Sequence, residues 1–143
     1  MSGFQPEFEM SHSVPVVIGV GDVVNRSLEL EDAIEPSELI LQAIGNALDD
    51  ADVTISHRIK LQEAVDSLAV VRTWTWPYPD LPGLIAARLG VNLKHKEYTD
   101  HGGNQPGRIF DEAARRISQG KCKVAVVTGA EALASRITPQ SYL

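Results

Sequence analysis

Short apolar runs alternate with amphipathic stretches along most of this chain. Four runs predict β-strands, at residues 14–20, 67–71, 96–99 and 124–127. The first and the last are continuously apolar and rich in valine, which is typical of strands buried on both faces of a parallel sheet. The run at 96–99 is short and carries charges, so it predicts a weaker strand.

Apolar residues at helical spacing fill the intervals between the predicted strands. The first helix is predicted to begin at Pro36, because proline suits the first helical position, and to end near Asp50. One apolar stripe follows its length: Leu39, Ile40, Ala43, Ile44, Ala47 and Leu48. Residues 57–64 are charged and predict one or two further turns.

A short helix is predicted after Asp80, whose carboxylate suits an N-cap. Pro82 falls in its first turn, and Gly90 is well placed to end it. Three of its apolar residues are expected to be buried: Leu84, Ile85 and Leu89.

The last helix is predicted to follow the turn at residues 101–104 and to end at Gly120. Asn104 or Gln105 is suited to cap it, with Pro106 in its first turn. Its apolar spacing predicts a buried face formed by Ile109, Phe110, Ala113, Ala114 and Ile117. Two ion pairs at i,i+4 spacing are expected on its solvent side: Asp111 with Arg115, and Glu112 with Arg116.

Strands that alternate with helices predict an α/β fold, with a mostly parallel central sheet and helices on both of its faces. Residues 1–13 are expected to form a flexible N-terminal tail, and residues 14–143 a single domain. The chain has 143 residues, of which 43% are hydrophobic and 22% charged, and these values suit one globular domain with a real core.

Composition also excludes several classes of protein. No apolar run approaches the 18 or so residues of a membrane span, and residues 1–13 lack the pattern of a signal peptide. The single cysteine, Cys122, allows no intramolecular disulfide, suits a reducing compartment and is expected to be a core thiol. The four histidines are scattered without ligand spacing, so no metal site is predicted.

The net charge of −6 is unevenly distributed. Residues 1–55 contain 11 of the 19 acidic residues and one basic residue, Arg26. Proteins that bind nucleic acid usually carry a basic patch and an overall positive charge, so no nucleic-acid partner is expected. The basic surplus after residue 55 either meets a phosphorylated small ligand or forms a solvated helix face.

Three aromatic residues alternate with prolines in the loop after the second predicted strand: Trp74, Trp76 and Tyr78. Proline stiffens such a loop and lowers the entropic penalty of presenting rings. The rings are suited to form a wall for an acyl chain, to anchor an interface, or simply to cover the sheet edge.

The turn before the last helix contains His101, Gly102, Gly103 and Asn104. His101 is either an acid or base near neutral pH or a structural, hydrogen-bonded histidine. Backbone N–H groups at the two glycines, together with the helix dipole, suit an anion or an oxyanion, although a tight turn with nothing bound explains them equally.

Gly19-Val20-Gly21 follows the first predicted strand and suggests a dinucleotide-binding fingerprint. The sixth position is Val24, and no helix is predicted there. The simpler interpretation is that the glycines let the chain leave the sheet edge.

Four segments together resemble the N-terminal half of the thiolase superfamily, and most closely the sterol-carrier-protein-type and other thiolase-like acetyl-CoA acetyltransferases. The segments are PVVIGVGDVVNR at 15–26, DSLAVVRTWTWPYPDLPGLIAARLG at 66–90, DHGGNQPGRIFDEAARRISQG at 100–120 and VAVVTGAEALAS at 124–135. The resemblance covers nearly everything after residue 14. It implies a thiolase-like half-domain and acyl transfer on acyl-CoA, with the CoA thioester as substrate and no other cofactor.

Thiolases form an acyl-enzyme on a cysteine at the N-terminus of a buried helix, where the dipole favours the thiolate. Counting back from Gly120 and Glu131 places this position at about Gly103, which carries no nucleophile. The resemblance implies a catalytic set of His101, Gly103 and Asn104. It implies a substrate-binding set of Gly102, Trp74, Trp76 and Tyr78.

A full thiolase has two similar α/β halves, and this chain is expected to supply only the first. The resemblance therefore implies a homodimer or a partner chain that supplies the second half, and a chain that alone lacks classical thiolysis. A cytoplasmic location is expected. The family also allows the peroxisome, but Ser141-Tyr142-Leu143 is not the peroxisomal signal Ser-Lys-Leu.

Two alternatives to an acyltransferase stay open. One is a non-catalytic binding or assembly module that keeps the fold and pairs with another chain through the strand at 96–99 and the aromatic loop. The other is a flavodoxin-like nucleotide binder, which shares the pattern of strands and helices, although the first predicted strand is not followed by a phosphate loop.

Overall fold

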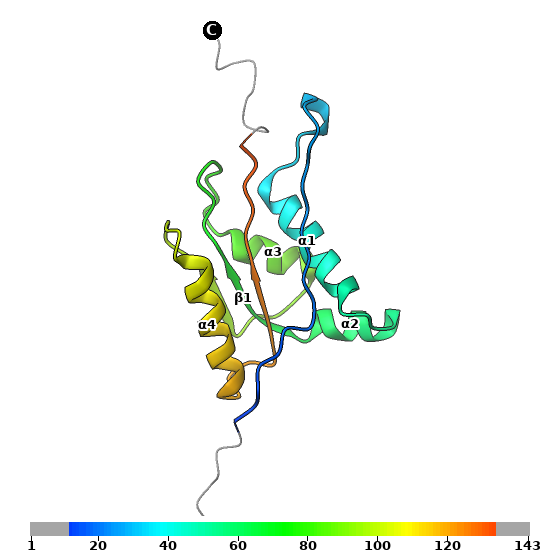
Figure 1. Cartoon of the computed structure of the whole chain (residues 1–143), viewed down its shortest axis with the longest axis vertical. Helices are drawn as coiled ribbons and strands as arrows, with labels where there is room; N and C mark the ends of the chain where they lie inside the picture. Colours follow the sequence, from blue (N-terminus) through cyan, green and yellow to red (C-terminus); the bar gives the residue numbers. More distant parts are fainter. Residues whose placement is uncertain (1–11, 134–143) are drawn as a thin grey trace, which may run out of the picture.

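The computed structural model of the protein describes residues 12–133 (Figure 1). The predicted tail at residues 1–13 lies outside this range except for His12 and Ser13, and the C-terminal tripeptide lies outside it as well. The elements, in chain order, are a 3-10 turn η1 (Leu30–Asp32), α1 (Pro36–Asp50), α2 (Ile55–Glu63), β1 (Val65–Val70), α3 (Leu81–Leu89), β2 (His95–Tyr98), α4 (Gln105–Ser118) and β3 (Val124–Thr128).

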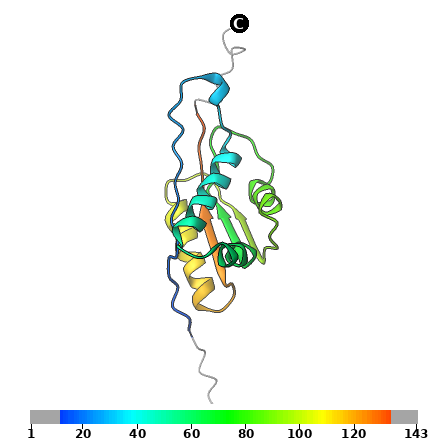
Figure 2. The same ribbon diagram turned by 90° about the vertical axis from the view of Figure 1, so that its right-hand side faces the viewer.

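The three strands form one parallel sheet in the order β2-β1-β3. The connection from β1 leads to β2 on one side of β1, and the connection from β2 leads back across β1 to β3 on its other side. Right-handed crossovers then place α3 and α4 on opposite faces of the sheet, as Figures 1 and 2 show. The predicted α/β class, the parallel sheet and the helices on both faces are confirmed.

The core lies between β1, α1 and α3. Its buried residues come from the apolar stripe of α1, from the middle of β1 and from one side of α3: Ile40, Ile44, Leu48, Leu68, Val70, Leu81 and Ile85. The stripe predicted for α1 is therefore confirmed. α4 packs separately, against β3, through Ile109 and Ala113.

The predicted signals at the ends of α3 are also confirmed. The Asp80 side chain accepts a hydrogen bond of 3.0 Å from the N–H of Gly83, and Gly90 ends the helix with a left-handed φ of 70°. On α4, Arg115 pairs with Asp111 at 2.8 Å and Arg116 with Glu112 at 3.4 Å, as expected.

Among the apolar residues of α3 and α4 that were predicted to be buried, Leu84 and Phe110 are exposed, and three are half-buried: Leu89, Ala114 and Ile117. Leu84 is 39% exposed, because Leu81 and Ile85 already occupy the side of this nine-residue helix that faces the sheet. Phe110 is 56% exposed, because Ile109 and Ala113 make the contact between α4 and β3. Helical spacing locates an apolar side of a helix but does not fix how much of that side is covered.

The predicted first strand is wrong. Residues 14–20 form no ladder with any described strand, and their valines and isoleucine are between 52% and 82% exposed. The segment instead passes the open edge of β3, between α1 and α4 (Figures 1 and 2). An apolar, β-branched run favours a strand, but pairing requires a neighbour at hydrogen-bonding distance, and β3 does not approach that closely.

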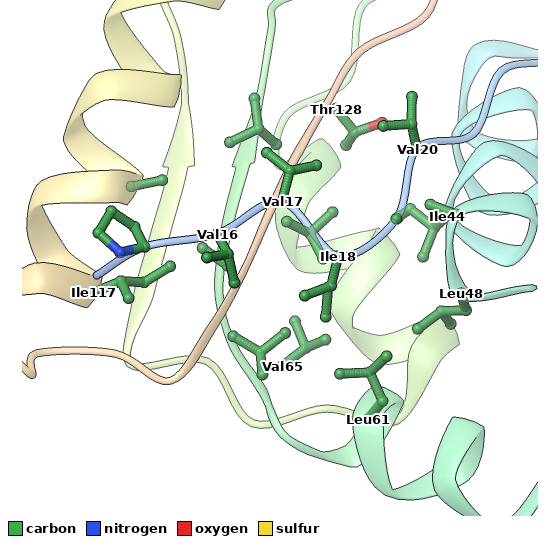
Figure 3. A pocket seen from close by; sticks show the side chains of 18 of the residues that line it. Val16, Val17, Ile18, Val20, Ile44, Leu48, Leu61, Val65, Ile117 and Thr128 are labelled. Atoms are coloured by element: carbon green, nitrogen blue, oxygen red, sulfur yellow. The ribbon is translucent and has the colours of Figure 1, made fainter. Parts of the chain in front are cut away.

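A hollow separates this N-terminal segment from the sheet. Its volume is about 660 Å³, and its lining is almost wholly apolar. Figure 3 shows Ile18 directed toward Leu61 and Val65 across it, whereas the neighbouring Val17 points the opposite way. The segment therefore contacts the helices more closely than it contacts the sheet.

Gly19 and Gly21 hold the N-terminal segment against α1. A methyl group at Gly19 would overlap the carbonyl oxygen of Ala47, and one at Gly21 would overlap that of Ala43, one turn earlier. The Val20 N–H between them donates to the Asp50 carboxylate at 2.8 Å. The glycines thus serve close packing on a helix, and no helix follows them as a dinucleotide fingerprint would require.

Asp66 joins the amino ends of all three strands. Its Oδ1 accepts hydrogen bonds from the N–H groups of Lys123 (2.9 Å) and Val124 (3.2 Å) at the start of β3. Its Oδ2 pairs with the Lys94 ammonium, just before β2, at 3.1 Å. Burial alone would raise the pKa of Asp66, but these hydrogen bonds and the nearby ammonium outweigh burial and lower the pKa below its usual value of 3.8.

Replacing this carboxylate should destabilise the fold. We expect Asp66→Asn to lower the free energy of unfolding at pH 7 by roughly 1.5–3 kcal/mol, because charge-assisted hydrogen bonds to a buried group are lost. The pKa of Asp66 is depressed in the folded state, so its stabilisation is present above the unfolded pKa and is lost as pH falls through the folded pKa. Urea unfolding of both proteins from pH 7 to pH 2 measures this, and the difference should shrink below about pH 4.

Asp111→Asn is the matched control, because this carboxylate pairs with Arg115 on the exposed side of α4. Its effect should stay below about 1 kcal/mol. Equal losses for the two variants, or a gap between wild type and Asp66→Asn that persists unchanged to pH 2, would contradict the role given to Asp66.

The two glycines of the N-terminal segment should not tolerate alanine. Gly19→Ala and Gly21→Ala should each lower stability by roughly 1–3 kcal/mol, because the added methyl group forces the segment away from α1. Gly45→Ala, within α1, meets only the end of the Arg58 side chain at 3.9 Å and should gain about 1 kcal/mol from helix propensity. Thermal unfolding separates the two outcomes, and a Gly19→Ala protein as stable as wild type would show that the segment is not docked.

Candidate active site

The carboxyl ends of the three parallel strands meet at one edge of the sheet. Residues 71–80 follow β1, residues 99–104 follow β2, and residues 129–133 follow β3. In open α/β sheets, ligands bind outside this edge. The aromatic loop and the glycine turn singled out in the sequence both lie here, so this edge is the candidate site.

The loop after β1 is fixed by the residues after β3. The Glu131 carboxylate accepts hydrogen bonds from the Trp74 backbone N–H and from the Thr75 hydroxyl, the latter at 2.7 Å. The Trp76 indole N–H donates to the Ala132 carbonyl at 3.4 Å. Glu131 therefore shapes the loop, whereas the sequence suggested for it only the end of a strand.

The aromatic rings of the loop form two ring contacts. Trp74 lies against His101, with ring centroids 4.2 Å apart and planes inclined by 33°. Trp76 stacks with Tyr78 at 6.4 Å and 17°. The Tyr78 hydroxyl accepts a long hydrogen bond from the Ser37 N–H at 3.3 Å, and burial raises the pKa of Tyr78 above its usual value.

A pocket of about 450 Å³ opens between these rings and the end of β2, a volume typical of small-molecule sites. Four of the predicted site residues line it: Trp74, Trp76, Tyr78 and His101. Six lining residues were not predicted as site residues: Arg72, Thr73, Thr75, Pro77, Pro79 and Tyr98. Arg72 lies in the segment at 66–90 that carries the resemblance but was given no role there, and Tyr98 belongs to none of the quoted segments.

Arg72 is oriented from three directions. Its Nε donates to the Thr99 carbonyl at 2.7 Å, and its guanidinium lies 4.1 Å from the centre of the Tyr98 ring. Its backbone N–H donates to Thr99 Oγ1 at 3.0 Å. The side chain is thus directed by Tyr98, the last residue of β2, and by Thr99 after it, although Arg72 itself follows β1.

Gly102, Gly103 and Asn104 lie next to the pocket in sequence but do not line it. α4 begins at Gln105 with Asn104 in the N-cap position, and the Asn104 side chain makes no capping hydrogen bond. Within residues 12–133 the backbone N–H groups of both glycines donate to no acceptor. They are therefore free to donate to an anion at the N-terminus of α4.

Gly103 is exposed and open. A methyl group there would meet no atom within 4 Å, so the backbone leaves room for a side chain at the position where the family resemblance puts a nucleophile. Neither glycine of the turn has a positive φ, so the backbone does not require glycine at either position.

Cys122 is not a substitute for the missing nucleophile. It lies at the amino end of β3, away from the candidate site, and is 4% exposed. Burial, reinforced by the charge of Asp66, raises the pKa of this thiol. A thiol of this kind is a poor nucleophile at neutral pH.

The described part of the chain contains no group of three or more His, Cys, Asp or Glu side chains that could hold a metal ion. None of the helices in residues 12–133 is long and apolar enough to cross a membrane.

No protein-family profile matches the sequence, and a search of curated proteins finds no match. Solved structures do match. A monomeric SCP2-thiolase-like protein type 1 from Mycobacterium smegmatis superposes with a TM-score of 0.66 at 24% identity, over 81% of this chain and 23% of that one. An acetyl-CoA acetyltransferase from Syntrophomonas wolfei gives 0.60 at 18% identity, over 78% of this chain and 27% of that one.

A third structure, the 3-oxoacyl-(acyl carrier protein) synthase III FabH from Pseudomonas aeruginosa PAO1, gives a TM-score of 0.62 at 21% identity, over 87% of this chain and 45% of that one. The chain thus spans between about a quarter and under half of these proteins. At such identities the similarity shows the fold alone, and this chain shares the fold of the matching part of each of these proteins. The α/β half-domain fold that the sequence resemblance implied is confirmed at that level.

Position 103 should accept a reactive thiol. We expect Gly103→Cys to fold normally, because the site is open, and to react with iodoacetamide much faster than Cys122, because a helix N-terminus lowers a thiol pKa. The pH dependence of the alkylation rate, followed by peptide mass spectrometry, gives the pKa of each thiol.

Gln119→Cys is the matched control, since this position is also exposed but lies at the C-terminal end of α4, where the dipole disfavours a thiolate. If the thiol introduced at position 103 reacts no faster than the one at position 119, the turn does not activate a nucleophile.

Proposed function

We propose that this chain is a thiolase-like acyltransferase domain that acts on acyl-CoA thioesters. It would work in a reducing compartment such as the cytoplasm, within a homodimer or with a partner chain that supplies the second thiolase half. The observation that carries the proposal is the meeting of the aromatic pocket, His101 and the open N-terminus of α4 at the carboxyl edge of a thiolase-type sheet.

The proposed roles follow from this geometry. The rings of Trp74, Trp76 and Tyr78 provide an apolar wall for the acyl or pantetheine part of the substrate. His101, at the rim of that wall, is suited to transfer a proton at the reacting carbon or at the leaving thiol. The free N–H groups of Gly102 and Gly103 and the Asn104 amide are suited to stabilise a thioester oxyanion.

The glycine at position 103 limits the chemistry proposed for this chain. Without a thiol there, the chain has no nucleophile at the helix N-terminus on which to form an acyl-enzyme. Classical thiolysis by the chain alone is therefore not expected. The steps that remain are binding of the thioester, polarisation of its carbonyl and proton transfer at His101.

Acyl transfer to an introduced thiol tests this proposal. In Gly103→Cys, attack of the thiolate on the carbonyl carbon of acetoacetyl-CoA would release coenzyme A as its thiolate and leave an acyl thioester at position 103. Intact-protein and peptide mass spectrometry should show this adduct in the variant and none in the wild type. Thiolysis by the wild type together with an adduct on Cys122 would overturn the assignment of position 103.

The role of His101 is tested separately, on the full chain in its native assembly. His101→Ala should lower kcat for acyl transfer from the acyl-CoA thioester by roughly 10²–10⁴-fold, because general acid–base catalysis by the imidazole is lost. His57→Ala, on the exposed side of α2, is the control and should leave the rate unchanged. Unchanged turnover in His101→Ala would remove this residue from the mechanism.

A second candidate is a non-catalytic assembly module. It is favoured by the absence of a nucleophile at position 103 and by the open edges of the described sheet, one of them β2, as the sequence predicted. The exposed apolar residues 14–20 beside β3 add to this surface. Analytical ultracentrifugation tests its association, because a chain that stays monomeric at high concentration would count against this candidate. Acyl transfer by the assembled chain would favour the first candidate instead.

A further inference from the structure

One arginine ties the first turn of α4 to β2. The Nε of Arg108 donates to Gln105 Oε1 at 2.8 Å, and one terminal nitrogen donates to Glu112 at 2.7 Å. The other terminal nitrogen donates to Glu97, which lies on β2. A guanidinium presents its donors in a rigid planar fork, so three acceptors placed around it fix its orientation. Arg108 is therefore held in one position between a helix and a strand.

These contacts go beyond an ion pair along a helix. Glu112 is four residues from Arg108, a spacing that is common on helix surfaces. Glu97 instead comes from the sheet, and Arg116 approaches it at 4.0 Å while it contacts Glu112 at 3.4 Å. The side chains of these four charged residues are only 25–36% exposed. Charges that are partly out of water are screened less, so this group holds α4 against β2 more firmly than a surface pair can.

Gln105 passes this restraint to the turn before α4. A guanidinium only donates hydrogen bonds, so Gln105 directs its carbonyl oxygen at Arg108 and its amide nitrogen away from it. The Gln105 side chain lies against Gly102, where an added methyl group would come within 3.5 Å of Cγ and 3.6 Å of Nε2. The Gln105 N–H also donates to the Gly102 carbonyl at 3.1 Å. Contacts thus run without a break from β2 through Arg108 and Gln105 to the turn.

The other end of the turn is fixed as well. Thr99 is 1% exposed, and its N–H donates to the Val70 carbonyl of β1 at 3.1 Å. Residues 100–104 therefore span from an anchor on β1 to an anchor on β2. His101 and Gly103 lie within this span, so the two anchors determine where both residues are placed.

We infer that Arg108 is a positioning residue for this turn, and that through Gln105 it fixes the direction of the N–H groups of the two glycines. The inference rests on the proposed function, in which those N–H groups stabilise a thioester oxyanion. Such stabilisation requires donors that are already aimed at the place where charge develops, so a small rotation of the turn would weaken it. Arg108 lies outside the lining of the pocket and acts only through its neighbours.

A thiol at position 103 reports on this alignment. In the full chain with Gly103→Cys, the rate of alkylation by iodoacetamide below the thiol pKa follows the fraction of thiolate, which N–H groups aimed at the sulfur increase. Arg108→Met and Gln105→Met, each added to Gly103→Cys, should lower this rate by roughly threefold or more, because the helix N-terminus no longer faces the thiolate. Gln105→Met leaves every charge in place, so a loss of charge cannot explain its effect.

Glu97→Gln separates positioning from a simple effect of charge. Removal of a negative charge near the turn would by itself favour the thiolate and raise the rate of alkylation. Loss of the restraint on Arg108 should lower the rate instead. Arg115→Met is the matched control and should leave the rate unchanged, because this arginine pairs with Asp111 at an exposed site further along α4.

Thermal unfolding of each variant comes first, so that rates are compared only between folded proteins. Should Arg108→Met fail to fold, Gln105→Met and Glu97→Gln decide the question. Equal rates with and without Gln105→Met, or a higher rate in Glu97→Gln, would overturn the role given to Arg108.

Acylation of the same thiol separates this inference from the proposed function. If acetoacetyl-CoA acylates Gly103→Cys but the added variants leave the alkylation rate unchanged, the positioning role is wrong and the proposed function stands. If the alkylation rate falls in the added variants as expected but acetoacetyl-CoA forms no adduct, Arg108 positions the turn and the proposed function fails.

Discussion

The register of the sheet depends on one carboxylate at its amino end. Asp66 sits at an irregularity in the pairing of β1 with β3, where Val65 faces Val124 and Ser67 faces Ala125. Its side chain satisfies the two N–H groups at the start of β3 and holds the ammonium that precedes β2. A shift of either neighbour by one residue would leave a buried charge without partners, which is costly in a protein interior.

That register determines what meets at the other end of the sheet. Val70 is aligned with both Tyr98 and Thr128, so the residues that follow the three strands emerge at the same level. Arg72 therefore meets Thr99 and Tyr98, and the aromatic loop meets Glu131. The geometry of the candidate site is thus coupled through the strand pairing to Asp66, about 13 Å from the end of β1, given about 3.3 Å per residue over the four steps from Asp66 to Val70.

Much of this fold could be read from the sequence, because its signals were local. Pro36, Asp80 and Gly90 act at helix ends through the backbone next to them, and the stripe of α1 is a periodicity within one helix. The first strand failed because pairing is not local, and nothing in residues 14–20 reports the distance to β3. The site divides in the same way: the aromatic loop and the turn with His101 stood out as two local motifs, whereas the contact of Arg72 with Tyr98 and that of Glu131 with the aromatic loop form only through the sheet.

The two glycines of the N-terminal segment have a mechanical consequence. They are two residues apart in an extended chain, and the Ala43 and Ala47 carbonyls that they face are one helical turn apart, so both spacings are close to 6 Å. A slide by one residue would bring Val20, together with Ile18 or Asp22, against those carbonyls. The segment is therefore held in one register along α1 and cannot slide past it. It can leave the hollow beside β3 only by lifting from the helix or by moving together with it.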